Sequence, residues 1–291
     1  MDKTFDPFPF IVGAGRSGTT LLRLMLDSHT QLSIPAETGF LMELSNLTPG
    51  ADSNTIIQTM INHPCWPDLS VSAADFKEKA QSILPFELSE VIRTFYSTYA
   101  RQHGKTRYGD KTPGYCLFID KIQDIIPEAR FIHIIRDGRD VALSIRPLWF
   151  SPSDQIEGLA ADWCMRIKKT RELSRQCRHY MEIKYESLIM QPEVELRRIL
   201  DFIDLPYENQ MMDYYLHAPT RLTEVKDRYI LNGSRLITQA DRINAQRKTF
   251  QKPVKDNIFR WRTLMTPDEI CRYQQVAADT LLELGYELAY S

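Results

Sequence analysis

A glycine-spaced turn near the start of the sequence has the residues and the spacing of a phosphate-binding loop. Gly13 and Gly18 flank the turn, and a helix-like stretch that opens with Thr19 and Thr20 follows it. Glycines let the backbone curl so that several N–H groups point at one anion, and the helix N-terminus adds its partial positive charge. The common nucleoside-triphosphate loop has a lysine where this chain has Thr19, and Arg16 is the one cation of the turn. The sequence therefore predicts a phosphate-containing ligand other than ATP.

A second anion-binding position is predicted at the end of the apolar run 131–135. Arg136 follows that run directly, and Ser144 lies about two turns into the helix predicted after it. In a doubly wound sheet, ligands collect at the carboxyl ends of the strands, where Arg136 and the glycine-spaced turn would both lie. An arginine and a hydroxyl that converge there suit a second phosphate, so the ligand would carry two separated anionic groups. A structural ion pair between Arg136 and a carboxylate is the alternative.

The elements that must position these residues alternate between strand-like and helix-like segments. Amphipathic stretches such as 155–177 separate the strand-like runs, as expected for surface helices. This alternation predicts an α/β fold, with a P-loop-like parallel β-sheet that carries helices on both faces. The predicted strands are Phe8–Val12, 32–34, 107–110, 131–135 and 181–185.

Two long segments stand outside this alternation. Residues 45–105 are mostly helical in pattern, whereas residues 217–255 lack a clear apolar period and lean basic. We predict that 217–255 is a mobile lid over an anionic ligand, with a solvated surface excursion as the alternative. Residues 1–291 together are predicted to form a single domain.

Charge and cysteine content exclude several classes of protein. The 291 residues carry a net charge of −2, which provides no overall field toward nucleic acid or an anionic membrane. The five cysteines form no Cys-x-x-Cys pair, so neither a zinc site nor a disulfide framework is predicted. The sequence has no long apolar run and no signal-peptide pattern. We therefore expect a cytoplasmic protein with no metal, no nucleic-acid partner and no transmembrane segment.

Together, the two anion-binding positions resemble those of the sulfotransferase family that uses 3′-phosphoadenosine 5′-phosphosulfate (PAPS). The segment Gly-Arg-Ser-Gly-Thr-Thr-Leu-Leu at 15–22 is similar to the family's 5′-phosphosulfate loop, and Arg136 with Ser144 is similar to its 3′-phosphate pair. The resemblance covers roughly residues 8–205 and 256–288 and is nearest to the branch of bacterial and tyrosylprotein sulfotransferases. Further family-like segments are Asp-Lys-Thr-Pro at 110–113, Pro-Glu-Ala-Arg-Phe at 127–131, Tyr-Glu-Ser-Leu at 185–188, Arg-Trp-Arg at 260–262 and Leu-Gly-Tyr at 284–286.

The resemblance implies a donor site that binds PAPS and releases 3′,5′-ADP without a metal. It implies that Tyr185 contacts the same nucleotide and that Arg260 is a basic contact near the C-terminus. It also implies that the 3′-phosphate is held by Arg136 and Ser144. The residues that would wrap the 5′-phosphosulfate are Arg16, Ser17, Gly18, Thr19 and Thr20.

Sulfuryl transfer needs a base for the acceptor proton and cations for the developing charge. Glu37, after the predicted strand 32–34, is the candidate base, and partial burial would raise its pKa toward the working pH. The alternative is that Glu37 caps a helix that begins near Thr38. Lys111 and Arg16 are the candidate electrostatic stabilisers, and a surface pairing of Lys111 with Asp110 is the alternative. His63 is the reserve candidate for the base.

The acceptor is predicted only as a hydroxyl-bearing molecule. A glycan, a lipid, a small alcohol or phenol, and a tyrosyl peptide all remain open. Gly39 stands where the tyrosylprotein branch has an arginine that recognises acidic peptides, which argues against such an acceptor. We predict that 45–105 is an acceptor-side insertion whose aromatics either form an acceptor wall or pack its helices together. These aromatics are Trp66, Phe76, Phe86, Phe95, Tyr96 and Tyr99.

Two other functions compete with sulfuryl transfer. A nucleotide or small-metabolite kinase with a variant loop would lack both the loop lysine and a clear Mg²⁺-binding aspartate on a strand. A catalytically silent nucleotide-binding module would have no need of Glu37 and Lys111 beside the loop.

Overall fold

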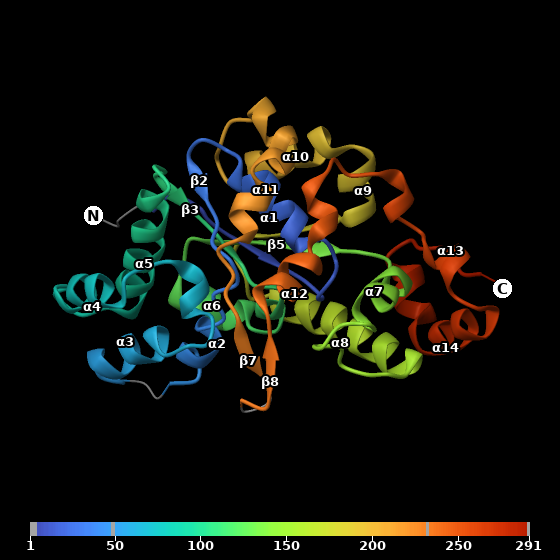
Figure 1. Cartoon of the computed structure of the whole chain (residues 1–291), viewed down its shortest axis with the longest axis horizontal. Coiled ribbons are helices and arrows are strands. Elements are labelled where there is room, and N and C mark those ends of the chain that lie inside the picture. The colour runs from blue at the N-terminus through green and yellow to red at the C-terminus, as the bar shows by residue number, and fades with distance from the viewer. Residues whose placement is uncertain (1–4, 48–49, 231–232, 290–291) are drawn as a thin grey trace.

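The structure, a computed structural model, describes residues 5–47, 50–230 and 233–289. A four-stranded parallel sheet lies at its centre, with the strand order β4-β1-β5-β6 (Figure 1). The predicted P-loop-like α/β fold is thereby confirmed. The strands are Phe8–Val12 (β1), Asp110–Lys111 (β4), Ala129–Ile135 (β5) and Tyr180–Lys184 (β6).

Helices cover both faces of the sheet, so the middle strands are almost wholly apolar. Ile11 and Ile132 pack against α1, α9 and α10, whereas Phe10 and Phe131 face the opposite cluster, because alternate side chains of a strand point to opposite faces. Figure 1 shows α1, α9 and α10 above the sheet and α6 and α8 below it. The helices are Thr19–Asp27 (α1), Ile119–Ile125 (α6), Gly138–Ile145 (α7), Ile156–Ser174 (α8), Tyr185–Met190 (α9) and Pro192–Phe202 (α10).

The second predicted strand is present but stands outside the central sheet. Leu32–Ser33 (β2) pairs in parallel with Arg107–Tyr108 (β3) as a separate two-stranded sheet. After β3, the chain passes through Gly109 into β4, which pairs with β1, and a Cβ on Gly109 would lie 2.9 Å from Cγ of Pro9. Glycine is therefore required for this close approach of two backbones.

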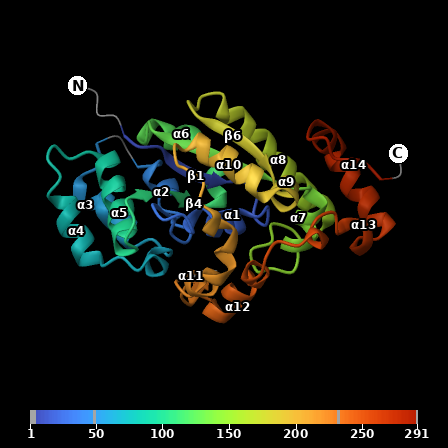
Figure 2. The same ribbon diagram turned by 90° about the horizontal axis from the view of Figure 1, so that it is seen from above.

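The 45–105 segment forms helices at one end of the molecule, as its pattern predicts (Figure 2). Asp52 and Ser72 start two of these helices by accepting hydrogen bonds from the backbone N–H groups of Thr55 at 3.0 Å and Asp75 at 3.3 Å. The helix Leu41–Leu44 (α2) comes just before this segment, whose elements are Ser53–Ile61 (α3), the 3-10 helix Trp66–Leu69 (η1), Ala73–Gln81 (α4) and Leu88–Gln102 (α5).

The C-terminal part combines short elements with a long closing helix. The 217–255 segment contains an antiparallel hairpin and two short helices. Among the described residues, no helix has both the length and the apolar character needed to cross a bilayer. The remaining elements are Ala218–Leu222 (α11), Arg228–Ile230 (β7), Arg235–Ile237 (β8), Gln239–Asn244 (α12), Trp261–Leu264 (α13) and Pro267–Glu283 (α14). The other 3-10 helices are Pro113–Leu117 (η2), Asn209–Leu216 (η3), Arg247–Phe250 (η4) and Lys255–Asn257 (η5).

Candidate active site

A cavity of about 560 Å³ lies at the carboxyl ends of the central strands. Both predicted anion-binding positions open into it, as do Glu37 and Lys111. The 217–255 segment supplies a further part of its lining, through residues between Leu222 and Pro253. The fold therefore brings together side chains that are more than one hundred residues apart in the sequence.

The glycine-spaced turn ends at the N-terminus of α1 and leaves that terminus open. Gly18 adopts a left-handed conformation with φ of 99°, and no side chain of the described residues caps the helix. The backbone N–H groups of the first turn are therefore free for an anion. A Cβ on Gly18 would lie 2.3 Å from Cδ2 of Tyr185, so the position requires glycine for space as well as conformation. Thr19 and Thr20 line the cavity, whereas Ser17 is buried beneath the turn.

Arg16 crosses the cavity from the turn toward two other segments. Its Nε donates to Oγ of Ser144 at 3.2 Å, and its Nη2 donates to the carbonyl oxygen of Ala245 at 2.8 Å. Burial and the neighbouring Arg136 lower the pKa of the Arg16 guanidinium. Half-buried Arg16 and buried Arg136 are neighbouring cations, so the site favours an anion between them.

Arg136 packs against Arg16 and Tyr185. It donates to the carbonyl oxygens of Arg16 at 3.2 Å and Asn257 at 2.7 Å, and its guanidinium lies 4.5 Å from the centre of the Tyr185 ring. The alternative ion pair also exists, because Nη2 lies 3.3 Å from Oδ2 of Asp140. Its buried Nε nevertheless finds no hydrogen-bond partner among the described residues. A buried donor left unbonded costs about 1–3 kcal/mol, so the site favours a ligand that offers an acceptor.

Glu37 and Lys111 form a close ion pair that lines the same cavity. Nζ of Lys111 lies 2.6 Å from Oε1 of Glu37, and the two side chains are 5% and 46% exposed, respectively. Burial raises the pKa of Glu37, but Lys111, Arg228 and Arg242 outweigh it, so the net pKa is lowered. The predicted rise in pKa is therefore wrong. Glu37 is a carboxylate at neutral pH and can accept a proton directly.

Both structural alternatives for this pair are wrong. The nearby helix α2 begins at Leu41, and no side chain in the described part of the chain caps it, so Glu37 is not a helix cap. Lys111 is buried and pairs with Glu37 instead of forming a surface pair with Asp110.

A buried network behind this ion pair was not predicted from the sequence. Thr38 and Tyr96 donate their hydroxyl hydrogens to Oδ2 of Asp110, each at 2.8 Å. Burial raises the pKa of Asp110 to about 6. Because Thr38 follows Glu37 and Asp110 precedes Lys111, the network fixes the backbone on both sides of the ion pair.

His63, the reserve candidate for the base, lies behind Gly39 and does not line the cavity. Its Nδ1 accepts from the backbone N–H of Cys65 at 3.1 Å, and its Nε2 lies 3.3 Å from Oε1 of Glu43. A Cβ on Gly39 would lie 2.3 Å from Cε1 of this ring, which gives a steric reason for glycine at that position. Burial lowers the pKa of His63, so the ring is neutral at physiological pH.

The aromatics of the 45–105 segment do not form an acceptor wall. The rings of Trp66 and Phe76 are tilted against each other with centres 5.2 Å apart, and those of Phe95 and Tyr96 meet edge to face at 5.0 Å. None of the six predicted rings lines the cavity. They pack the helices together, which is the alternative that the sequence left open.

Arg260 lines the cavity, as the resemblance implies for a basic contact. Sequence reasoning missed several other lining residues. For the missed cations of 217–255, the one signal was the basic composition of that segment, which did not indicate which side chains face inward. The missed residues include Arg23, Trp149, Phe150, Arg228, Arg242 and Lys248.

The fold and this cavity define an α/β protein with a P-loop-like anion-binding loop. The profile of the Sulfotransferase family matches residues 7–209, so the chain belongs to this family and is an enzyme of sulfotransferase type. Nodulation protein NoeE of Sinorhizobium fredii is 26% identical over 99% of this chain and 68% of its own length. Protein-tyrosine sulfotransferase A of Caenorhabditis elegans is also 26% identical, over 97% of this chain and 68% of its own. The sulfotransferase domain from the curacin biosynthetic pathway shares the fold, with a TM-score of 0.63, 17% identity and coverage of 99% and 100%.

Proposed function

We propose that this sulfotransferase moves the sulfuryl group of PAPS to a hydroxyl oxygen and releases 3′,5′-ADP. One observation carries the proposal: half-buried Arg16, buried Arg136 and an open helix N-terminus share a cavity with the Glu37–Lys111 pair. A donor with two separated anionic groups matches the two cationic positions. A kinase is not favoured, because Thr19 stands in place of the loop lysine.

The residues present fit such a donor. Arg16, Thr19 and Thr20 surround the open N-terminus of α1, which suits the 5′-phosphosulfate. Arg136, with its unbonded Nε, and Ser144 suit the 3′-phosphate. Further contacts assigned by this proposal are the backbone of Ser17 and Gly18 and the side chains of Tyr185 and Arg260.

In the proposed reaction, Glu37 accepts the proton of the acceptor hydroxyl. The acceptor oxygen forms a bond to sulfur while the bond between sulfur and the 5′-phosphate oxygen breaks. The electron pair of that bond leaves with 3′,5′-ADP, so atoms and charge balance. Lys111 and Arg16 stabilise the negative charge on the transferring and leaving oxygens.

The acceptor is proposed at the level of a hydroxyl compound. One relative is named a protein-tyrosine sulfotransferase, which supports a hydroxyl acceptor. A glycan, a lipid, a small alcohol or phenol, and a tyrosyl peptide remain open. The cytoplasmic location, the single-domain organisation and the lid role of 217–255 stay predictions.

Thermal unfolding with added nucleotides tests the donor. We expect 3′,5′-ADP to raise the melting temperature without metal and ATP with Mg²⁺ to have little effect. Protection by ATP with Mg²⁺ alone would favour the kinase. Incubation with ³⁵S-labelled PAPS and a cell extract then tests transfer, and the labelled product identifies the acceptor. Protection by 3′,5′-ADP with no labelled product from any acceptor would indicate a silent binding module.

A further inference from the structure

Asp68 joins the two long segments that stand outside the sequence pattern of the family. It lies in η1, within the 45–105 segment, and is only 2% exposed. Its Oδ1 accepts from the backbone N–H of Lys226 at 2.8 Å. Arg242 binds both carboxylate oxygens, at 2.9 and 2.7 Å, and Arg228 adds a further charge-assisted hydrogen bond. All three partners belong to residues 226–242.

The partners of Asp68 face the cavity as well as the carboxylate. Arg228 and Arg242 both line the cavity, and their side chains are 24% and 14% exposed. Both contribute to the lowered pKa of Glu37. Arg242 also donates to the carbonyl oxygen of Lys226 at 2.6 Å, which ties α12 to the strand that begins the hairpin. Asp68 is therefore placed to determine where these two cations sit relative to Glu37.

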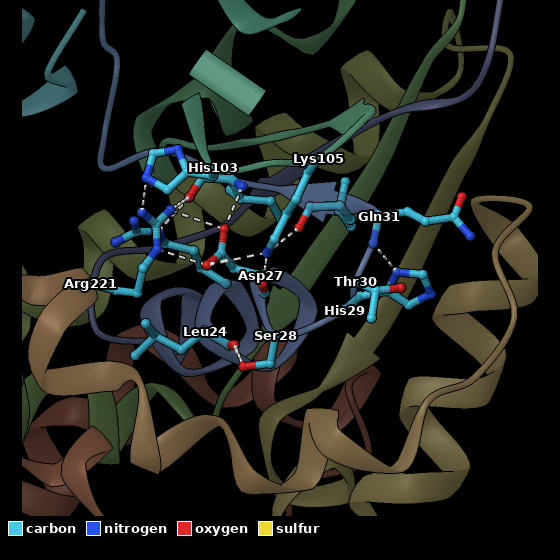
Figure 3. Close-up of polar contacts among 12 residues, drawn as sticks. Leu24, Asp27, Ser28, His29, Thr30, Gln31, His103, Lys105 and Arg221 are labelled. Carbon is cyan, nitrogen blue, oxygen red and sulfur yellow. Dashed lines mark hydrogen bonds and ion pairs between the residues drawn. The ribbon is translucent and has the colours of Figure 1, made fainter. Parts of the chain in front are cut away.

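The same segment is held independently at its start. Figure 3 shows Arg221 against Asp27 at the C-terminal end of α1, beside Lys105. The guanidinium of Arg221 donates to both carboxylate oxygens of Asp27, at 2.8 and 3.0 Å. Glu224 adds an ion pair with Arg23 at 3.0 Å. Loss of the Asp68 contacts would therefore free residues 226–242 without detaching the segment from α1.

The geometry of Asp68 differs from that of an ordinary surface ion pair. An exposed pair contributes about 0–1 kcal/mol, because water and salt screen it. Here one buried carboxylate accepts charge-assisted hydrogen bonds from two guanidinium groups, one of them bidentate. Removal of the carboxylate would leave two adjacent cations without their shared counter-charge.

We propose that Asp68 is a positioning residue that latches residues 226–230 and 233–242 over the cavity and holds Arg228 and Arg242 beside Glu37. The latch shapes the part of the cavity around Glu37, where the acceptor hydroxyl is proposed to bind. The role of the latch in acceptor binding rests on the proposed function. The latch itself does not, because it is a contact between two segments of the chain.

The test compares Asp68→Asn with Asp75→Asn, a control that removes an exposed carboxylate from the same helical region. Amide hydrogen exchange, followed by mass spectrometry, measures how fast the backbone of residues 226–244 exchanges with solvent. A kinetic assay with 4-nitrophenol as the probe acceptor measures the KM. We expect Asp68→Asn to speed exchange in that segment and to raise the KM for 4-nitrophenol about tenfold, equivalent to about 1.4 kcal/mol. The affinity for 3′,5′-ADP should change by less than the KM, since Arg136 is held by Arg16 and Asn257, while the Arg16 contact with Ala245 lies just beyond α12. In Asp68→Glu, which keeps the carboxylate, the KM for 4-nitrophenol should lie between the values of Asp68→Asn and the wild type.

A double-mutant cycle separates the latch from direct action by its partner. If Asp68 acts through Arg242, the Asp68→Asn/Arg242→Gln pair should raise the KM little more than the larger single variant. Additive effects would overturn the proposal, as would unchanged exchange in Asp68→Asn. If Asp68→Asn does not fold, Arg242→Gln breaks the same contact from the other side, and unchanged exchange in that variant is equally decisive. A wild-type protein that fails to bind 3′,5′-ADP would overturn the proposed function, whereas the exchange result would still decide the latch.

Discussion

The part of the cavity that is proposed to bind the donor (the donor end) and the part that is proposed to bind the acceptor (the acceptor end) are built in different ways. At the donor end, the glycine-spaced turn, Thr19 and Thr20 are contiguous, and Arg136 directly follows a strand. At the acceptor end, Glu37, Lys111, Asp68 and Arg242 come from four separate segments and meet only through packing and ion pairs. A site made of one turn and one strand end has a local sequence pattern, whereas a site assembled from remote segments has none.

The acceptor end should be the more sensitive to a change of a single charge. Glu37→Gln keeps the size of the side chain but removes its ability to accept a proton. We expect kcat to fall by about 10²- to 10⁴-fold while the affinity for 3′,5′-ADP is retained. Single-turnover assays and isothermal titration measure the two effects. Near-normal turnover would assign the base elsewhere, and the exposed Glu43→Gln is the matched control.

A substitution at the donor end should weaken nucleotide binding but leave the turnover rate of the bound complex unchanged. Arg136→Ala removes the guanidinium and its unbonded Nε from the cavity. We expect the Kd for 3′,5′-ADP to rise about 100-fold, as for loss of a charged hydrogen-bonding partner. Arg146→Ala removes a partly exposed arginine of the next helix and serves as the control. An unchanged Kd in Arg136→Ala would remove the second anion-binding position.

The buried Asp110 should make the free energy of unfolding depend on pH. The pKa of Asp110 in the folded state is raised to about 6, above the value of about 3.9 for an unfolded chain. The folded state therefore binds more protons, and stability is lost as the pH rises from about 4 through about 6. Relative to wild type, Asp110→Asn should gain about 2–3 kcal/mol in free energy of unfolding over that range. Denaturant titrations at several pH values measure this, and parallel pH curves for both proteins would contradict it.

The smallest expected effect is on stability, for a substitution of Gly18 in the glycine-spaced turn, and Gly104 provides a matched control. Gly18→Ala forces a Cβ against the Tyr185 ring at a left-handed position, whereas Gly104→Ala has a similar φ of +69° and nothing within 4 Å. We expect Gly104→Ala to cost about 1 kcal/mol in free energy of unfolding and Gly18→Ala to cost about 1–2 kcal/mol more. Equal losses would mean that the contact with Tyr185 relaxes without cost.

Several expectations failed at the acceptor end for one physical reason. Burial alone predicts a raised pKa for Glu37, but Lys111, Arg228 and Arg242 reverse the sign. These cations are distant in sequence, so their proximity is a property of the folded chain. The aromatics of the 45–105 segment have a composition that suits either a binding wall or a helical core, and only their contacts decide for the core.

By itself, the sequence determined the parallel α/β fold, the family and the turn with its following helix, because these depend on local patterns of apolar residues, glycines and caps. Only the tertiary structure decided which cations face Glu37, why Gly39 is glycine and that Asp68 joins two unrelated segments. Charge interactions and steric exclusion act through space, so residues far apart in the chain carry no signal of them until the chain is folded.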